Sequence, residues 1–410
     1  MPPLVTDPEE VTAVAAAVAR ARLAAFDLEF LSQDRLIPSL CLVQVAWLDG
    51  HDALDEQTGT IVASQLRVVL LDPLAVDVRP VIEALAAHSC VVAHAPRQDL
   101  ALLAARFGVA LPHVLDSQLM AAFAGIGDQV GFASLARELL GIALDKDQQW
   151  TDWAARPLSD AQLVYADADV RHLPAIYAQL AKRLGERIEW ARAESALVAS
   201  EAVAATQVTP ETAWRNISGL RGLPPIVLAT AIELAAWRQR VAMELDRPLG
   251  QVLNDKLLID LARQRPGSSG ALRSFRGISP TVRTRADDLI KIIASADASR
   301  APVHLAGRAP SARAQRWAEP LFSIVQLVAE RTRLPPRLLA TRSDTDEFAR
   351  VVDEGGLDAA ATLPALATWR RDVIGQVWVE WLSGKLALVG DLAAAHGIQL
   401  VRGDGVKFVK

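Results

Sequence analysis

Four carboxylates and one phenol in the N-terminal part of the chain have the types and spacing for metal-assisted chemistry. The stretch AFDLEF carries two of the acids, Asp27 and Glu29, on a strand-like segment. Side chains two apart on a strand project from the same face, so the acids point together while Phe26, Leu28 and Phe30 pack on the other face. Paired carboxylates repel, and a fold tolerates them mainly around a cation. Taken alone, the stretch also fits an edge strand with one face in water.

Two further segments supply the other acids. In VVAHAPRQDLALL a strand-like run ends at His94, and Asp99 falls in the first turn of the following helix. In LVYADADVRHL, Tyr165 and Asp169 are four residues apart on a predicted helix and share one face. Asp167 lies about 200° away around that helix from Tyr165 and is expected to face solvent.

The carboxylates of Asp27, Glu29, Asp99 and Asp169 are hard oxygen ligands, which suit Mg²⁺ or Mn²⁺ better than zinc. Two such ions can assist phosphodiester cleavage.

The elements that position these acids alternate between strand and helix patterns over residues 1–190, which indicates an α/β domain. Apolar runs of strand length predict strands at Leu23–Phe30, Leu40–Leu48, Val68–Leu71 and Cys90–Ala93. Capping and periodicity predict helices from Pro8 to about Arg20, at Pro80–Ala87, at Asp99–Phe107, and from about Ser159 past Leu184.

Residues 227–410 read as helices separated by joints rich in Pro, Gly, Ser and Arg. Within them there is a faint repeat at an offset of 87 residues. Its matched positions are Ala242, Pro248 and Leu261-Ala262 in the first copy and Ala329, Pro335 and Phe348-Ala349 in the second. A repeat of that length predicts two copies of one small helical domain.

Composition narrows the class of protein. The 410 residues are 51% hydrophobic and 22% charged, enough for two or three globular domains. The only cysteines are Cys41 and Cys90, and no histidine cluster has metal spacing, which argues against a disulfide framework and a zinc site. The acidic start MPPLVTDPEE does not resemble a signal peptide, and no apolar run has the length to span a bilayer. We expect a cytoplasmic protein.

Charge is distributed unevenly along the chain. The net charge of −5 argues against a general nucleic-acid coat protein. Between Arg263 and Lys291, however, seven basic residues face two acidic ones, a local net charge of +5. This stretch fits either a solvated helical face or a contact with a nucleic-acid backbone.

The three acidic motifs, taken in order, resemble those of the ribonuclease D family, exonucleases with a DEDD-type active site. AFDLEF resembles the first motif, AHAPRQDL the second, and YADAD the third in its tyrosine form. The flanking segments PSLCLVQVAW, LDSQLMAAFAG and GFASLARELLG agree, so the resemblance covers nearly all of residues 10–190. It implies a ribonuclease-H-like domain with a mixed sheet.

The C-terminal half adds a second resemblance. The segment LAAWRQRVAMELDRPLGQVLNDKLLIDLARQRPGSSGALRSFRGIS is similar to the HRDC domain shared by RecQ helicases and ribonuclease D. The weaker repeat around 321–385 resembles a divergent second copy. The implied order is an exonuclease domain at 1–205, a first all-α HRDC domain with linker at 206–305, and a second HRDC-like domain at 306–410.

The resemblance implies that RNA is hydrolysed from its 3′ end, with release of nucleoside 5′-monophosphates. Asp27, Glu29, Asp99 and Asp169 are expected to hold two Mg²⁺ or Mn²⁺ ions, and Tyr165 to orient the attacking water or help to deprotonate it. The family suggests tRNA precursors and other small stable RNAs as substrates, with no membrane and no obligate protein partner. A DNA 3′ exonuclease and an inactive RNA-binding adaptor remain alternatives.

A further group of residues is expected to touch the substrate. Leu28 stands where the family usually has threonine, so a backbone contact to the terminal nucleotide survives and a hydroxyl contact is lost. His94 either touches phosphate or caps its strand, and Trp150 and Trp153 either stack on bases or belong to the core. The candidate RNA-backbone contacts in the basic stretch are Arg273, Arg276, Arg283 and Arg285. Gln44 and Asp116 fall in family-like segments and are expected to support the site or the packing.

Overall fold

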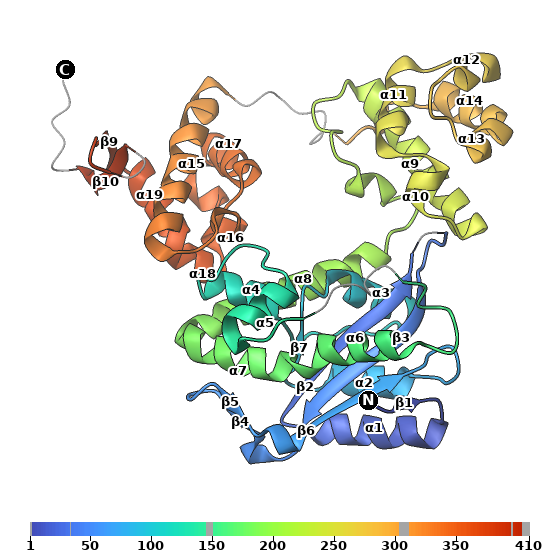
Figure 1. The fold of residues 1–410 in the computed structure, drawn as a ribbon. Coiled ribbons are helices and arrows are strands. Elements are labelled where there is room, and N and C mark those ends of the chain that lie inside the picture. Colours follow the sequence, from blue (N-terminus) through green and yellow to red (C-terminus); the bar gives the residue numbers. More distant parts are fainter. Residues whose placement is uncertain (1, 33, 145–150, 303–310, 395–396, 404–410) are drawn as a thin grey trace.

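The computed structural model describes residues 2–32, 34–144, 151–302, 311–394 and 397–403. Figure 1 shows an N-terminal α/β domain in blue to green, followed by a first helical domain in yellow and a second in orange to red. Both helical domains lie on the same side of the α/β domain. The predicted fold class, a mixed-sheet α/β domain followed by a helical region, is confirmed.

One mixed sheet of six strands, in the order β1-β6-β3-β2-β7-β8, forms the centre of the α/β domain. Strand β2 (Leu23–Leu31) pairs antiparallel with β3 (Ser39–Leu48) and parallel with β7 (Val91–Ala93), so the strand with the paired acids is interior and not an edge. The other strands of the sheet are β1 (Leu4–Val5), β6 (Leu66–Leu71) and β8 (Val114–Asp116), and β4 (Leu54–Asp55) with β5 (Thr60–Ile61) forms a separate small hairpin. The four predicted strands are confirmed, whereas β1 and β8 are too short to show periodicity.

Helices cover both faces of this sheet. One face packs against α1 (Pro8–Arg20), α2 (Arg79–Ala87), α3 (Arg97–Phe107) and the end of α8 (Ile188–Thr206). The other face carries α6 (Asp160–Arg171) and α7 (Leu173–Leu184), with α4 (Ser117–Phe123) and α5 (Phe132–Leu140) packed beside α7. The two faces therefore bury separate hydrophobic cores.

The helix predicted to continue from about Ser159 past Leu184 is in fact two helices. It breaks at His172, which ends α6 and precedes α7. Pro174 explains the break, because it lacks the N–H that would bond to the carbonyl of Val170 and its ring clashes with that carbonyl. Prediction of a single continuous helix was wrong for this reason.

The two helical domains begin with the same succession of elements. The first contains α9 (Pro225–Leu245), α10 (Leu249–Val252), α11 (Asp255–Gln264), α12 (Ser269–Arg273), α13 (Pro280–Thr284) and α14 (Ala286–Ser295). The second contains α15 (Ala312–Thr332), α16 (Pro336–Leu339), α17 (Arg342–Ala359), α18 (Thr368–Arg370) and α19 (Gln376–Leu382). In each, a 21-residue helix is followed by a helix of 4 residues and then by a longer one.

The faint sequence repeat coincides with this succession. The long helices α9 and α15 end on left-handed residues, Asp246 (φ 47°) and Arg333 (φ 57°), which are 87 positions apart. Pro248 and Pro335 then occupy the same position before the short helices. These equivalences support the proposal that the second helical domain is a divergent copy of the first.

The second helical domain also contains a β-hairpin that the sequence analysis did not foresee. Strands β9 (Leu386–Gly390) and β10 (Ile398–Arg402) pair antiparallel after α19. Leu388 and Leu400 pair across the hairpin and pack against the domain core, which gives the hairpin its apolar face.

In the described part of the chain, helices of membrane-spanning length and hydropathy are absent.

Candidate active site

Strand β2 presents its two acids on one face, as the spacing predicted. Phe26 and Leu28 lie in the core on the opposite face, where Leu28 is only 5% exposed. Asp27 lies opposite Gln44 of β3 in the antiparallel register. Gln44 is fully buried, and neither polar atom of its amide has a hydrogen-bond partner among the described residues. The face that holds the acids is therefore polar inside an otherwise apolar sheet.

Helix α6 brings the third acid to the same place. Carboxylate oxygens of Asp27, Glu29 and Asp169 lie within 4.8 Å of one another. Asp99 lies in the first turn of α3 and is close enough for its charge to raise the pKa of Asp27 and of Glu29, although it is outside the 4.8 Å group. The hydroxyl of Tyr165 interacts with Asp169, one helical turn along α6. Three elements thus converge as expected.

Burial and mutual repulsion make this cluster hard to ionise fully. Burial, reinforced by Asp27, Asp169 and Asp99, raises the pKa of Glu29 to about 9. Burial and the charge of Asp27 raise the pKa of Asp169 to about 8. Burial, together with the charge of Asp116, raises the pKa of Asp99 to about 7. At neutral pH the cluster therefore retains protons unless a cation compensates its charge.

The donor set fits a hard divalent cation. Within the described ranges, no Lys, Arg or His side chain forms an ion pair with Asp27, Glu29, Asp99 or Asp169, although nearby carboxylates are paired. Buried carboxylates without a cationic partner are costly, and oxygen-only ligands favour Mg²⁺ or Mn²⁺. The residues present are those that such an ion requires.

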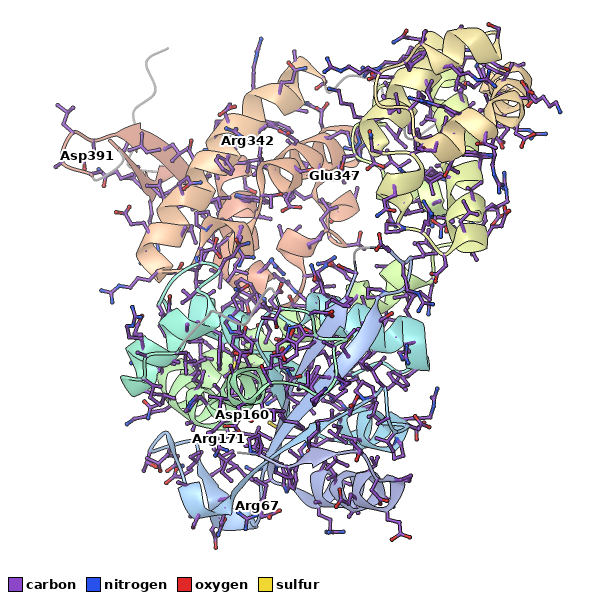
Figure 2. All side chains as sticks on the ribbon, turned by 45° about the vertical axis from the view of Figure 1, so that its right-hand side comes forward. Arg67, Asp160, Arg171, Arg342, Glu347 and Asp391 are labelled. Carbon is purple, nitrogen blue, oxygen red and sulfur yellow. The ribbon has the colours of Figure 1, made fainter. Side chains whose placement is uncertain are left out.

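Asp167 lies outside this cluster. It forms an ion pair with Arg171 at 2.5 Å on α6. The sequence predicted that Asp167 would face solvent, whereas in the structure it is half-buried. Figure 2 labels Asp160 and Arg171, which mark the two ends of α6 on the sheet. Asp167 and Arg171 neutralise each other, which leaves Asp169 as the acid that α6 contributes to the cluster.

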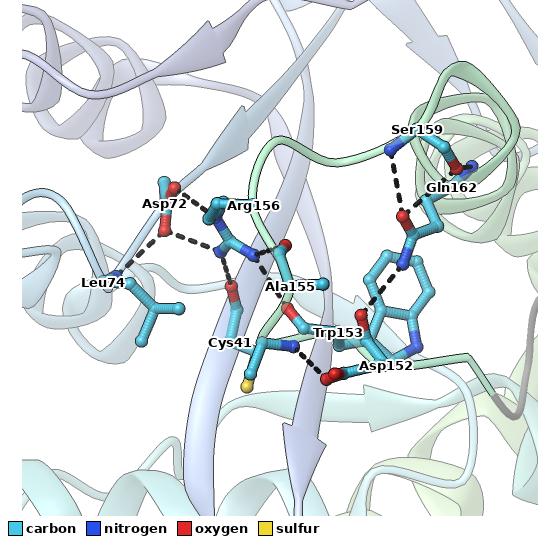
Figure 3. Close-up of polar contacts among 10 residues, drawn as sticks. Cys41, Asp72, Leu74, Asp152, Trp153, Ala155, Arg156, Ser159 and Gln162 are labelled. Carbon is cyan, nitrogen blue, oxygen red and sulfur yellow. Dashed lines mark hydrogen bonds and ion pairs between the residues drawn. The ribbon is translucent and has the colours of Figure 1, made fainter.

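A clamp around Arg156 fixes the loop that leads into α6. The Arg156 guanidinium donates to both carboxylate oxygens of Asp72, at 2.6 and 2.7 Å, and to the carbonyl of Cys41 at 2.7 Å (Figure 3). It also donates to the carbonyls of Trp153 and Ala155. Asp72 follows β6 and Cys41 belongs to β3, so the loop is tied to the sheet just before α6 begins.

The start of α6 is held by a second set of contacts. Ser159 and Gln162 form a capping box, in which each side chain binds the backbone N–H of the other residue. The Gln162 amide also donates to the carbonyl of Asp152 (Figure 3). It donates to Thr151 Oγ1 as well. These bonds set the rotation of α6 and hence the direction of Tyr165 and Asp169.

Trp153 has a packing role in this structure. Its side chain is 2% exposed and lies in a core cluster between the sheet and α6, with its ring centroid 6.0 Å from that of Tyr165. A ring buried in this way favours the core alternative over stacking on a base, and it packs beside Tyr165. Trp150, the other tryptophan considered, lies outside the described residues.

Asp116 organises the turn before α3, a role that sequence reasoning did not specify. Its carboxylate accepts the backbone N–H of Ala95 at 2.8 Å and that of Gln118 at 2.8 Å. Ala95 has φ 50°, an uncommon conformation for a residue other than glycine. Because Asp99 follows within four residues, this bond fixes the point from which Asp99 enters the site. The pattern LDSQL, with an acid before a helix, carried the signal for a cap.

His94 occupies the end of β7 as a neutral side chain. Its Nδ1 lies 2.9 Å from Ser117 Oγ, and its ring packs 5.5 Å from that of Phe132. Burial lowers the pKa of His94 to about 4. A neutral, half-buried imidazole offers no charge to a phosphate, so its placement favours the capping alternative.

The predicted basic contacts separate into two groups. Arg273, Arg276 and Arg283 are exposed on the first helical domain. Arg285 instead forms a two-point ion pair with Glu244, at 2.6 and 2.8 Å, so its charge is already compensated. Arg285 is therefore a weaker candidate for a phosphate contact than the three exposed arginines, and its role stays a prediction. In Figure 1, α12 and α13 lie at the end of this domain remote from the sheet.

Comparisons with known proteins agree with this geometry. A family model described as 3′-5′ exonuclease matches residues 2–185, and an HRDC domain model matches residues 228–293. The fold and the acidic site thus define a 3′–5′ exonuclease with a helical accessory region.

Relatives over the full chain make the assignment narrower. The chain is 32% identical to ribonuclease D of Acidiphilium cryptum, covering 94% of each protein, and 34% identical to that of Jannaschia sp., covering 95% of this chain and 97% of the relative. The crystal structure of Escherichia coli RNase D, an exoribonuclease involved in structured RNA processing, matches with a TM-score of 0.73 at 27% identity and covers 93% of this chain and 98% of that chain. The chain belongs to the ribonuclease D family.

Proposed function

We propose that this 3′–5′ exoribonuclease is metal-dependent and trims the 3′ ends of structured RNA, such as tRNA precursors, releasing nucleoside 5′-monophosphates. The observation that carries the proposal is the convergence of Asp27, Glu29 and Asp169 within 4.8 Å, with no cationic side chain paired to them in the described part of the chain. The similarity to an exoribonuclease involved in structured RNA processing supports the substrate class.

Asp27, Glu29, Asp99 and Asp169 are the proposed ligands of two Mg²⁺ or Mn²⁺ ions. Such ions, when bound, supply the means to activate a water and to stabilise the leaving oxygen. Tyr165 is proposed to orient that water. Burial and the neighbouring carboxylates raise the pKa of Tyr165, so the phenol keeps its proton at neutral pH and acts as a hydrogen-bonding group. This favours positioning over deprotonation.

Two further contacts complete the proposal. The Leu28 side chain is buried in the core, so only its backbone is available to a terminal nucleotide. Arg273, Arg276 and Arg283 are proposed to contact the RNA backbone. Their triple alanine variant should bind RNA more weakly and with a smaller salt dependence, whereas Arg285→Ala serves as the control because Glu244 already compensates that charge. Equal salt dependence in the triple variant would rule out these contacts.

The decisive assay uses 5′-labelled RNA and matched DNA with Mg²⁺, Mn²⁺ or EDTA. We expect a ladder on RNA that disappears with EDTA and in Asp169→Asn. Asp167→Asn on the same helix is the matched control, because Asp167 pairs with Arg171 outside the cluster. Equal cleavage of DNA would favour the repair exonuclease, and absence of cleavage with every metal would favour the inactive adaptor.

A cytoplasmic location is also proposed. Both cysteines of the chain, Cys41 and Cys90, are free thiols, and Cys41 is fully buried. Free thiols are the usual state in a reducing compartment. Separation of cell fractions followed by immunodetection tests this location.

A further inference from the structure

The amide of Gln44 is buried beside the acidic site. Gln44 belongs to β3, which is an interior strand between β2 and β6. Its side chain is 0% exposed, and both Oε1 and Nε2 lack a hydrogen-bond partner among the described residues. Buried amides are nearly always hydrogen-bonded, because an unpaired one costs free energy. An unpaired amide in the middle of a sheet therefore calls for a functional explanation.

The neighbouring strands leave Gln44 a single polar neighbour on its face of the sheet. On its own strand the neighbours on that face are Leu42 and Ala46, since side chains two apart point to the same side. Its paired residue on β6 is Leu70, and its paired residue on β2 is Asp27. Leu42, Ala46 and Leu70 are apolar and fully buried. Asp27 is therefore the partner that the sheet places beside the amide.

The spacing of these two side chains suits one hydrogen bond. Directly paired residues of antiparallel strands have Cβ atoms about 4.5–5.5 Å apart. Glutamine is one methylene group longer than aspartate, so rotation of its side chain can carry Nε2 to the Asp27 carboxylate while the strands stay paired. That carboxylate already accepts the backbone N–H of Leu28. Its two oxygens have acceptor sites for a second N–H and for a cation.

A neutral donor suits a carboxylate that holds a cation. Ligating carboxylates are ordinarily hydrogen-bonded by neighbouring groups, which fix their orientation. Arginine or lysine at position 44 would place a positive charge beside the ions and oppose their binding. A glutamine amide supplies the N–H without that charge. Gln44 thus fits the acidic cluster, whose members have no cationic partner in the described part of the chain.

We propose that Gln44 is a positioning residue, whose Nε2 donates to the carboxylate of Asp27 and holds it in the orientation that binds a divalent ion. The inference rests on the proposed metal-dependent function, since it takes Asp27 to be a metal ligand. It has two consequences of opposite sign. Loss of the amide should weaken metal binding, whereas the metal-free fold should lose nothing, because the amide is unpaired in this structure.

The test separates metal affinity from fold stability. Isothermal titration calorimetry measures Mn²⁺ binding to the full chain, and differential scanning fluorimetry in EDTA measures the midpoint temperature of unfolding. Gln44→Met keeps a side chain of similar length without a donor, and Gln44→Leu is a second apolar variant of different shape. Gln239→Met is the matched control, because Gln239 is also buried with an unpaired amide oxygen but belongs to α9 in the first helical domain. Circular dichroism establishes that each variant is folded.

We expect both Gln44 variants to bind Mn²⁺ about 10- to 100-fold more weakly than the native protein. In EDTA, Gln44→Met should unfold at or above the native midpoint, because it removes a buried amide without a partner. Its cleavage of RNA should regain the native rate at saturating Mn²⁺, since Gln44 acts on ion binding. Gln239→Met should bind Mn²⁺ as the native protein does.

Affinity for Mn²⁺ within twofold of native in both Gln44 variants would overturn the proposal and leave the metal site standing. A lower midpoint in EDTA together with that native affinity would assign Gln44 to packing. Equally weakened Mn²⁺ binding in Gln239→Met would show that the loss is not specific to Gln44, and would also overturn the proposal. Failure of the native chain to bind Mn²⁺ would instead overturn the proposed metal-dependent function, and the role of Gln44 with it.

Discussion

The carboxylate of Asp116 holds the backbone N–H of Ala95 at 2.8 Å, in the left-handed turn from which α3 starts. Asp116 lies at the end of β8 and acts as the cap of α4, so one side chain joins the starts of two helices. Asp116 influences Asp99 in two ways, through the turn that it holds and through its charge, which helps to raise the pKa of Asp99.

Asp116→Ala should therefore reduce activity without removing any metal ligand. We expect cleavage to fall by about 10- to 100-fold, the usual effect of losing a group that orients a ligand. Asp116→Asn keeps an acceptor oxygen for the Ala95 amide and should retain most of the activity. The apparent affinity for Mg²⁺, from the dependence of rate on metal concentration, should weaken in the alanine variant. Native metal affinity in that variant would contradict a positioning role.

Addition of metal should stabilise the protein, and Asp27→Asn should reduce that gain. Burial and repulsion raise the pKa values of Glu29 to about 9 and of Asp169 to about 8, so the native state holds protons that the unfolded state releases. The metal-free protein should thus lose stability as pH rises from about 5 to 9. Differential scanning fluorimetry at pH 8 should show that Mg²⁺ raises the midpoint temperature of unfolding, and that it does so less in Asp27→Asn.

In metal-free buffer at pH 8, Asp27→Asn should melt at a higher temperature than the native protein, because one repelling carboxylate is gone. Asp52→Asn, at an exposed position, is the matched control. It should leave the midpoint of thermal unfolding unchanged both without metal and with Mg²⁺. If Asp27→Asn melts lower than native without metal, the acids do not repel one another in the way that their burial indicates.

His94 should make the protein sensitive to acid in the opposite direction. Burial lowers its pKa from 6.5 to about 4, so the unfolded state binds a proton before the native state does. Stability from this group is complete above about pH 6.5 and declines as pH falls toward 4, by up to about 3 kcal/mol. Urea unfolding of native protein and His94→Gln at pH 7 and pH 4.5 isolates the effect. Between pH 7 and pH 4.5 the native protein should lose more free energy of unfolding than His94→Gln does. His113→Gln, at an exposed position, is the control and should lose as much as the native protein.

A buried ion pair should fix the second helical domain to the α/β domain. Glu194 on α8 accepts from Arg370 at 2.7 Å and from the indole of Trp369 at 2.9 Å, and the Trp369 ring stacks on Trp190. Glu194→Gln leaves the Arg370 charge without its partner and should cost about 3 kcal/mol of stability. Denaturant unfolding followed by tryptophan fluorescence measures this loss.

The matched control for that change is Glu201→Gln, farther along α8. Glu201 also pairs with an arginine, Arg97, but both side chains are largely exposed and such pairs contribute little. Equal destabilisation by the two substitutions would show that burial of the Glu194 pair has no special importance.

The acids of the site could be predicted because local geometry decides where they point. Spacing of two on a strand and four on a helix fixes a common face for Asp27 and Glu29, and for Tyr165 and Asp169. Their convergence from separate elements followed from the family resemblance, since no single segment encodes it. The large apolar strands were visible for the same local reason, while β8 has only three residues and no detectable period.

Side chains whose role depends on distant partners could not be assigned from the sequence. Arg285 is one of several arginines in a basic stretch, and only the fold brings Glu244, 41 positions earlier, against it. Trp153 is likewise ambiguous until α6 closes over it. Asp116 shows a local cap pattern in the sequence. Its bond to the turn at Ala95 could not be predicted, because Ala95 lies 21 positions away.

The two helical domains contact the α/β domain in unlike ways. At the end of α9, Asp246 forms an ion pair with Arg35 and accepts the backbone N–H of Leu36, and the side chains of this pair are about half exposed. In the second helical domain, the pair of Arg370 with Glu194 is largely buried. Dissolved salt screens exposed charges more than buried ones. Rising ionic strength should therefore weaken the electrostatic contact of the first helical domain before that of the second.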